Sequence, residues 1–307
     1  MSSYLFPHFT NGKKGDRECV WFAVSRDGLN WTDLGGDEPV LTSSVGTTGV
    51  RDPFILYDES REKYVIIATD LCTTKGGNWH QYSYKGSRCL VVWESDDLIH
   101  WSRERLVEVG IDRAGCVWAP EAVYCKEKES WFVFWASNVR EKGHLSSKQR
   151  IYGAFTKDFA TFTPAFKYID AETDIIDTNI IWDGDYYYRF SKDETHKKIT
   201  VERCKSLVPG EGEKFERLPC ELLDGFFGLE GPEAYQLDDG RWCLIADQYH
   251  TKGGYLPMLC DDLSKADFRK PDEGAYNMGK RIKRHGSVIK ISDEKAQELI
   301  GFYGTDE

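Results

Sequence analysis

The chain has 307 residues, with 40 Lys and Arg against 51 Asp and Glu, and a formal net charge of −11. The chain carries an excess of acidic residues and no cluster of basic ones, which argues against a protein that binds nucleic acid or an anionic membrane surface. No window approaches the run of about 18 apolar residues that crosses a bilayer. Aromatic residues make up 14% of the chain, which favours many short strands or a protein that stacks rings on its ligand.

The nine cysteines are odd in number, and no two have the C-x-x-C spacing of a zinc or redox motif. Several lie in apolar runs, such as Cys89 in RCLVVW and Cys243 in RWCLIAD. We therefore expect buried, reduced thiols. The N-terminal residues carry no basic segment followed by an apolar stretch, so no signal peptide is expected and the protein is predicted to be cytoplasmic.

In chain order, strand-like runs alternate with turn-forming residues. The N-terminal runs YLFPHF and ECVWFAVS come first. Four hairpin patterns follow, each opened by a polar residue and split by a turn: 51–68, 119–136, 177–190 and 230–246. Residues 73–86, rich in glycine and polar side chains, predict an exposed loop. Only 292–304 predicts a helix, with Ser292 or Asp293 as its cap.

A second pattern repeats in step with the hairpins. A strand ends in Ser/Thr-x-Asp and an aromatic residue follows, as in SRDGLNW, SDDLIHW and TKDFATF, with degenerate copies ending at Phe215 and Phe268. A repeat of about 50–60 residues built from strands predicts an all-β, five-bladed β-propeller. Residues 285–292 supply the fifth inner strand, and the N-terminal strands complete that blade. We predict one domain over 1–307, with the ring closed by both chain ends.

In a propeller, the residues that open the inner strands meet at one mouth of the central channel. Those residues are Asp52, Glu121, Asp177, Glu230 and His285. Gathering four carboxylates is unfavourable for stability, so their convergence points to chemistry. Two carboxylates on opposite sides of a glycosidic bond can act as acid and base in hydrolysis, and a third nearby can raise the pKa of the acid.

Five motifs carry a family resemblance over essentially the whole chain. RDPFI (51–55), WAPEA (118–122), IDTNII (176–181), LEGPEAY (229–235) and RHGSVIKIS (284–292) resemble glycoside hydrolase family 43. The resemblance implies a five-bladed propeller and an inverting enzyme, of a family made up mostly of α-L-arabinofuranosidases, arabinanases and β-xylosidases.

By motif, the resemblance implies that Asp52 is the general base, Asp177 the pKa-modulating aspartate and Glu230 the general acid. It also implies that His285 neighbours a bound calcium ion or water. No cofactor is otherwise expected. The chain departs from the family pattern at Thr178, where a proline often stands, and at Glu121, where many members have aspartate.

Other side chains are candidates for substrate contact. Trp79 and Trp118 could stack on a sugar ring, and Glu121 and Arg189 could bind hydroxyl groups. Each has an alternative reading: loop packing for Trp79, bonds to nearby backbone for Glu121 and a plain ion pair for Arg189. Glu233 competes with Glu230 for the acid role, but residues three apart on a strand do not both face the channel mouth.

The sequence therefore predicts an inverting exo-glycosidase that releases terminal α-L-arabinofuranosyl residues, with β-D-xylosyl residues as a second substrate. Its partners would be arabinose- or xylose-containing oligosaccharides. For an inverting enzyme, the carboxyl groups of Asp52 and Glu230 should lie roughly 6.5–9.5 Å apart. Two alternatives stay open: a non-catalytic sugar-binding propeller, and a phosphorolytic propeller enzyme acting on another glycoside.

Overall fold

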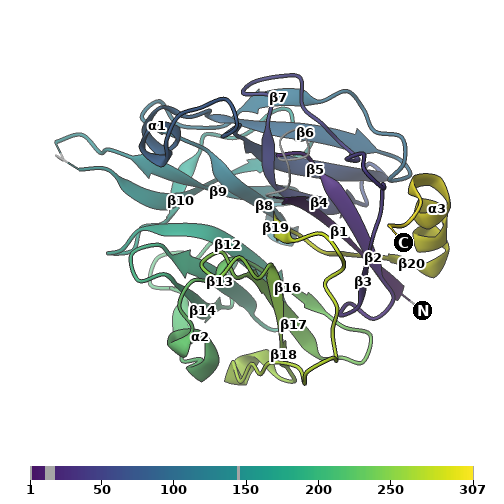
Figure 1. The fold of residues 1–307 in the computed structure, drawn as a ribbon. Helices are drawn as coiled ribbons and strands as arrows, with labels where there is room; N and C mark the ends of the chain where they lie inside the picture. Colours follow the sequence, from purple (N-terminus) through teal and green to yellow (C-terminus); the bar gives the residue numbers. More distant parts are fainter. Residues whose placement is uncertain (1, 11–17, 144–145, 307) are drawn as a thin grey trace.

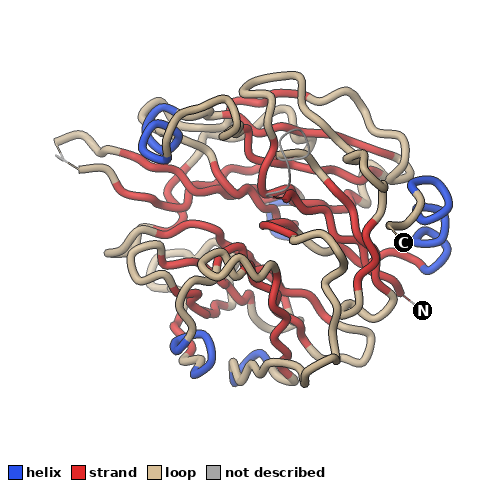
Figure 2. Tube along the Cα trace, viewed as in Figure 1, coloured by secondary structure: helices blue, strands red, loops and turns tan. Residues whose placement is uncertain are grey.

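The computed structural model describes residues 2–10, 18–143 and 146–306. Its strands form five antiparallel sheets arranged around an axis as a five-bladed β-propeller, and helices are few and peripheral (Figures 1 and 2). The predicted all-β class and five-bladed architecture are confirmed. Within the described ranges, no helix is long and apolar enough to span a bilayer.

Three consecutive four-stranded sheets follow the chain, each beginning with its innermost strand. Blade 1 holds β4 (Val50–Asp58), β5 (Lys63–Asp70), β6 (Cys89–Ser95) and β7 (Arg105–Glu108). Blade 2 holds β8 (Trp118–Cys125), β9 (Ser130–Val139), β10 (Lys148–Thr156) and β11 (Phe166–Ile169). Blade 3 holds β12 (Ile175–Trp182), β13 (Tyr187–Asp193), β14 (Lys198–Cys204) and β15 (Glu216–Leu218).

The last two sheets depart from the four-strand plan. Blade 4 has three strands, β16 (Glu230–Gln236), β17 (Trp242–Asp247) and β18 (Tyr255–Cys260). Blade 5 joins the chain ends: β19 (Lys283–Gly286) pairs with β1 (Ser2–Thr10), and β2 (Trp21–Ser25) and β3 (Trp31–Asp33) continue outward. The predicted inner strand 285–292 is in fact two short strands, because β20 (Ile289–Ser292) pairs separately with β1. Closure by both chain ends is confirmed.

The core is divided among the interfaces between adjacent blades. In β5, Val65 and Ile67 pack toward blade 2, whereas Ile66 and Ala68 pack toward blade 5. The central strands are buried on both faces, which explains their continuous apolar sequences. All nine cysteines are reduced thiols, and seven of them are buried, in agreement with the prediction.

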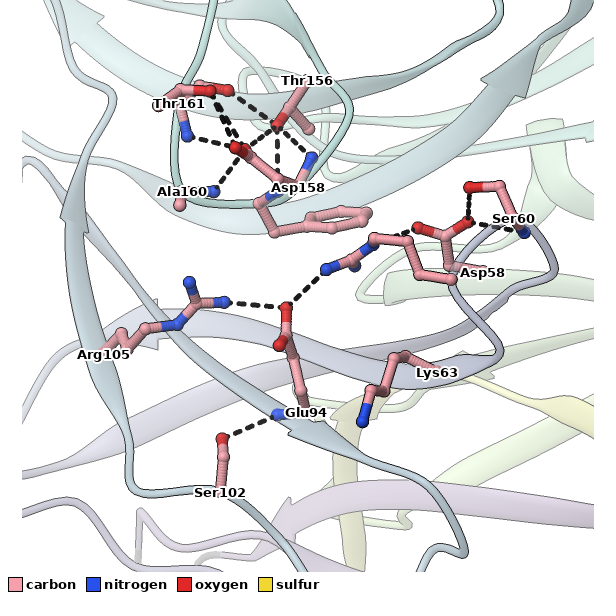
Figure 3. A network of polar contacts seen from close by, with 12 residues as sticks. Asp58, Ser60, Lys63, Glu94, Ser102, Arg105, Thr156, Asp158, Ala160 and Thr161 are labelled. Carbon is pink, nitrogen blue, oxygen red and sulfur yellow. Dashed lines mark hydrogen bonds and ion pairs between the residues drawn. The ribbon is translucent and has the colours of Figure 1, made fainter.

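The repeated Ser/Thr-x-Asp pattern forms the turn that follows β2, β6 and β10 in their blades. Asp158 accepts hydrogen bonds from the backbone N–H groups of Ala160 and Thr161, at 2.9 and 2.8 Å (Figure 3). Asp27 and Asp97 make the same turn in blades 5 and 1. Beside the Asp158 turn, Glu94 accepts from Arg105 in a polar network on blade 1 (Figure 3). The pattern is therefore blade architecture.

The helices lie at the periphery. The predicted C-terminal helix is confirmed as α3 (Asp293–Tyr303), with Ser292 as its N-cap. The segment 73–86 was expected to be a loop, but it contains α1 (Trp79–Lys85). Asn78 and Gln81 form a capping box there, which stabilises a helix too short to form alone. The remaining short helices are α2 (Glu221–Gly225), η1 (Lys126–Lys128) and η2 (Leu263–Lys265).

Candidate active site

A backbone irregularity recurs near the start of every inner strand. The pairing register shifts at Asp52, Ala119, Asp177, Gly231 and His285, so each inner strand carries a bulge at the equivalent position. The first four of these residues have a positive φ, between 46° and 54°. A bulge turns its side chain out of the sheet alternation, and here it turns Asp52, Asp177 and His285 toward the axis.

These side chains and Glu230 line one cavity of about 510 Å³ at the mouth of the channel. Asp52 comes from blade 1, Asp177 from blade 3 and Glu230 from blade 4, with His285 from blade 5. The predicted convergence of the three carboxylates is therefore present in the structure. Their catalytic roles remain predictions.

Asp52 is fixed by the neighbouring strand. Its Oδ2 accepts a hydrogen bond of 2.8 Å from Thr69 Oγ1. The same hydroxyl oxygen accepts a 2.8 Å bond from the backbone N–H of Ala119 in blade 2. The hydroxyl group thus orients the carboxylate of Asp52 and ties blade 1 to blade 2.

Asp177 lies between the other acidic groups. Burial raises its pKa to about 6; Glu230 and Asp52 add to the rise, and His285 opposes it. Its Oδ2 accepts a 3.1 Å bond from the backbone N–H of Gly231, and its Oδ1 lies 3.9 Å from His285 Nδ1. His285 Nδ1 is also 3.6 Å from Asp52 Oδ1, so the imidazole stands between the two aspartates.

Glu230 is held by two cations. Lys192 Nζ donates to Oε2 and Arg284 Nη2 donates to Oε1, both at 2.7 Å. Burial alone would raise the pKa of Glu230, but the positive charges of Lys192 and Arg284 outweigh it and lower the pKa below its ordinary value. In the free protein, this carboxylate is therefore favoured in its ionised form.

Aromatic rings form one wall of the cavity. Trp79, on α1, is 58% exposed, and its ring centroid lies 6.1 Å from that of Trp118 in an edge-to-face arrangement. The guanidinium of Arg51 lies over the rings of Phe9 and Trp79, at 4.4 and 5.4 Å from their centroids. The large exposed surface of Trp79 is available for stacking on a ligand.

Glu121 does not belong to this cavity lining. It lies two residues beyond the bulge and points into the channel below, where it is 3% exposed. The side chain of Asn179 donates both to Glu121 Oε2, at 2.9 Å, and to Glu233 Oε2, at 2.7 Å. Burial raises the pKa of both carboxyls, that of Glu233 to about 8. The structure therefore places Glu121 outside the cavity lining, with a side chain rather than backbone as its partner, and a substrate contact by Glu121 stays a prediction.

Arg189 is also placed elsewhere. Its guanidinium donates to Glu202 Oε2 through Nε and Nη2, at 2.9 and 2.7 Å, and lies 4.0 Å from the ring centroid of Phe215. This is a separate surface cavity between blades 2 and 3. Arg189 follows the two-residue alternation of β13 to the side that faces blade 2, where its guanidinium also lies 5.5 Å from the ring centroid of Tyr168. Its role in substrate binding stays a prediction, and the structure places it outside the cavity that holds the three carboxylates.

A metal ion beside His285 was expected, but the described residues around it do not form a set of metal ligands. Among the described residues, no group of three or more His, Cys, Asp or Glu side chains could hold a metal ion. The two oxygens nearest to His285 Nδ1 belong to Asp52 and Asp177.

Several lining residues were not predicted from the sequence, among them Lys192, Glu194, Tyr249 and Arg284. Arg284 had a usable signal, because it precedes the bulge residue His285 as Arg51 precedes Asp52. Lys192 had none: β13 is buried along its whole length, so alternation does not single out one of its residues.

The comparisons with known proteins agree with this architecture. Residues 1–297 match the glycosyl hydrolase family 43-related family, described as "Probable glycosyl hydrolase domain". An α-L-arabinofuranosidase of Bifidobacterium longum subsp. longum is 30% identical over 318 residues, which cover 90% of this chain and 29% of that protein. The chain thus corresponds to less than a third of this relative.

Solved structures support the fold alone, because their identities are low. An endo-1,4-β-xylanase from Bacteroides thetaiotaomicron has a TM-score of 0.55 at 13% identity, covering 93% of each chain. The catalytic domain of an α-L-arabinofuranosidase from Coprinopsis cinerea has a TM-score of 0.55 at 14% identity, covering 83% of this chain and 77% of that one.

Proposed function

Because the chain belongs to the glycosyl hydrolase family 43-related family and is a glycoside hydrolase, we propose that it releases terminal α-L-arabinofuranosyl residues from oligosaccharides by a single displacement with inversion. The observation that carries the proposal is the convergence of Asp52, Asp177 and Glu230 from three blades on one cavity. The arabinofuranosidase relative supports the choice of sugar.

In this proposal, Asp52 is the general base. Its carboxylate, oriented by Thr69, takes a proton from the attacking water. Glu230 is the general acid on the other side of the scissile bond and gives its proton to the leaving oxygen. Asp177, with its Oδ2 on the backbone N–H of Gly231, adds negative charge that favours the protonated form of Glu230.

The aromatic wall supplies binding energy. Trp79 and Trp118 would stack on the sugar rings of the substrate, because both rings border the cavity and Trp79 is largely exposed. A β-D-xylosyl group presents similar hydroxyl geometry and is the second substrate to test.

The first test compares the parent protein with Glu230→Gln on p-nitrophenyl α-L-arabinofuranoside and β-D-xyloside, and on an arabino-oligosaccharide. We expect turnover by the parent and a loss of about 100-fold or more on the oligosaccharide, whose leaving group needs protonation. The loss on the nitrophenyl glycosides should be smaller. A variant as active as the parent would show that Glu230 is not the general acid. A parent protein that hydrolyses none of the three substrates would favour a sugar-binding propeller.

The second test follows the product by proton NMR from the first turnovers. Inversion of an α-L-arabinofuranoside releases the β-anomer first, and retention would reject the single displacement. A phosphorolytic enzyme would instead need added phosphate. Arg51, Lys192 and Arg284 do line the cavity, but Lys192 and Arg284 are already paired with carboxylates, so we expect turnover in phosphate-free buffer.

A further inference from the structure

The two cations that hold Glu230 each have a second carboxylate partner. Lys192 Nζ lies 2.7 Å from Glu230 Oε2 and 2.7 Å from Glu194 Oε2. Arg284 donates through Nη2 to Glu230 and through Nε to Asp247. Glu230 is therefore part of a six-residue chain of alternating charge, because Glu194 is in turn paired with Lys197 through its Oε1.

This arrangement matters because a general acid must carry a proton before it can act. Protonation of Glu230 removes one negative charge and weakens its ion pairs with Lys192 and Arg284. A buried cation left without a partner is strongly unfavourable. Glu194 and Asp247 oppose that outcome, since each contacts one of the two cations.

Glu194 and Asp247, the second carboxylate partners of Lys192 and Arg284, differ in burial and hydrogen bonding. Asp247 is buried, with a side chain only 1% exposed, and its hydrogen bond with Arg284 is already made. The side chain of Glu194 is 33% exposed, and its Oε2 has no hydrogen-bond geometry toward a donor although Lys192 Nζ is close. The Lys192–Glu194 contact is thus an ion pair that can still become a hydrogen bond.

Lys192 has little freedom to do anything else. Its side chain is 3% exposed, and its Nζ lies 4.2 Å from the ring centroid of Tyr249. Because the Lys192 ammonium is buried among rings and carboxylates, it can make only a short movement between Glu230 and Glu194. Lys192 therefore lies between the proposed acid and an accessible carboxylate at the rim.

We propose that Lys192 and Glu194 are a positioning pair that governs when Glu230 carries its proton, with Lys192 shifting from Glu230 to Glu194 as Glu230 is protonated. The proposal rests on the proposed role of Glu230 as general acid. Neither residue of the pair is a catalytic residue in this scheme, because both act through Glu230.

Other charged groups face Glu230 and stay in place during this exchange. They are Arg284 and His285 of β19, Asp247 of β17, Asp177 of β12 and Tyr249 beyond β17. Lys192 lowers the pKa of Glu230, and the negative charge of Glu194 in turn raises the pKa of Lys192 after burial has lowered it. The signs of these effects agree with the proposed exchange.

The test measures the pH dependence of kcat/KM on an arabino-oligosaccharide for the parent, Lys192→Met and Glu194→Gln. The alkaline limb reports the pKa of the acid in the free enzyme. Lys192→Met should move that limb to higher pH by about one unit, because a stabilising cation is lost. Glu194→Gln should move it to lower pH, because Lys192 then pairs with Glu230 alone.

The double variant Lys192→Met/Glu194→Gln separates an effect through Lys192 from a direct one. If Glu194 acts through Lys192, replacing it in the Lys192→Met background should change the limb by less than half of its effect in the parent. The exposed Glu59→Gln is the control for an equal change in net charge. An unmoved limb in Glu194→Gln, or a full effect in the double variant, would overturn the proposal.

A second measurement needs no turnover. The carboxyl carbon of Glu230 can be titrated by NMR in ¹³C-glutamate-labelled protein, with Glu230→Gln supplying the assignment. The same opposite shifts are expected in Lys192→Met and Glu194→Gln. If the parent hydrolyses no glycoside but these shifts appear, the proposed function fails while the pair stands. If turnover occurs and the carboxyl does not respond to Glu194→Gln, the pair fails alone.

Discussion

Asp177 illustrates at the scale of one residue how the site opposes folding. Burial raises the pKa of its carboxyl from 3.8 to about 6, and the nearby Glu230 and Asp52 contribute to the rise. The folded protein therefore binds more protons than the unfolded chain between these two values. It follows that the free energy of unfolding decreases as the pH rises through this range and stays lower above it.

The variant Asp177→Asn should accordingly be more stable than the parent at neutral pH, although we expect it to lose most activity. The gain in the free energy of unfolding should be about 1–3 kcal/mol near pH 7.5. It should fall below about 1 kcal/mol near pH 4, where the carboxyl is neutral in the folded protein and only partly ionised in the unfolded chain. Urea unfolding followed by tryptophan fluorescence at both pH values measures it. A gain that is the same at both would contradict the ionisation argument.

The sequence was enough to predict which residues near the bulges come together at the site, but not which side chains they contact. Asp52, Asp177 and Glu230 each stand in a repeated motif at the opening of an inner strand, so their convergence followed from the repeat. Lys192 and Arg189 lie on one strand, three residues apart. Only the packing of β13 against its neighbours decides that Lys192 meets Glu230 while Arg189 meets Glu202.

At the scale of the element, the bulge is the device that builds the site. Gly231 is the bulge residue of β16, with a φ of 54°, and it packs against the ring of His285. A β-carbon at this position would lie 2.7 Å from His285 Cγ. Non-glycine residues adopt a similar φ at the equivalent bulges, Ala119 among them, so the close approach of the imidazole is what requires glycine here.

The substitution Gly231→Ala should therefore destabilise the protein by about 2–4 kcal/mol, the sum of backbone strain and a displaced His285. Gly240→Ala is a matched control, because Gly240 also has a positive φ of 90° but no atom within 4 Å of the added carbon. Chemical denaturation of both variants gives the difference. Equal losses would mean that the contact with His285 contributes nothing.

Element boundaries were the weaker part of the sequence prediction. The loop 73–86 was expected to be irregular because of its glycines, yet Asn78 and Gln81 carry the capping box that forms α1 and places Trp79 beside the cavity. Blade 4 has three strands where blades 1 to 3 have four, and an isolated bridge between Leu259 and Arg269 stands where its outer strand would pair. Because one bridge pairs a single residue, it does not produce the alternation of apolar and polar residues by which a strand is recognised in a sequence.

At the scale of the whole molecule, hydrogen bonds around the axis join every blade to the next. A side chain takes part in each link: Thr69 with Ala119, Glu121 with Asn179, Asn179 with Glu233, Glu233 with Val288, and Ser287 with Ile55. The ring lies around the channel close to the site. The positions of the carboxylates therefore depend on all five blades.

The link between blades 5 and 1 closes the ring and joins segments 232 residues apart. Ser287 Oγ accepts a 2.8 Å bond from the backbone N–H of Ile55 and lies 3.3 Å from the carbonyl oxygen of Pro53. Ser287 is 1% exposed, so water cannot replace its hydroxyl without a local rearrangement. Its removal would leave the N–H of Ile55 buried without an acceptor.

Ser287→Ala should therefore lower the free energy of unfolding by about 1–3 kcal/mol, as expected for an unsatisfied buried donor. The exposed Ser146→Ala should change it by less than about 0.5 kcal/mol. Urea unfolding of the two variants and the parent provides the comparison, and hydrogen exchange at the Ile55 amide localises the effect. Since that amide is protected by the closing blade, its exchange should accelerate in Ser287→Ala and not in the control. A parent-like stability with unchanged exchange would mean that the link between Ser287 and Ile55 does not contribute to closing the ring.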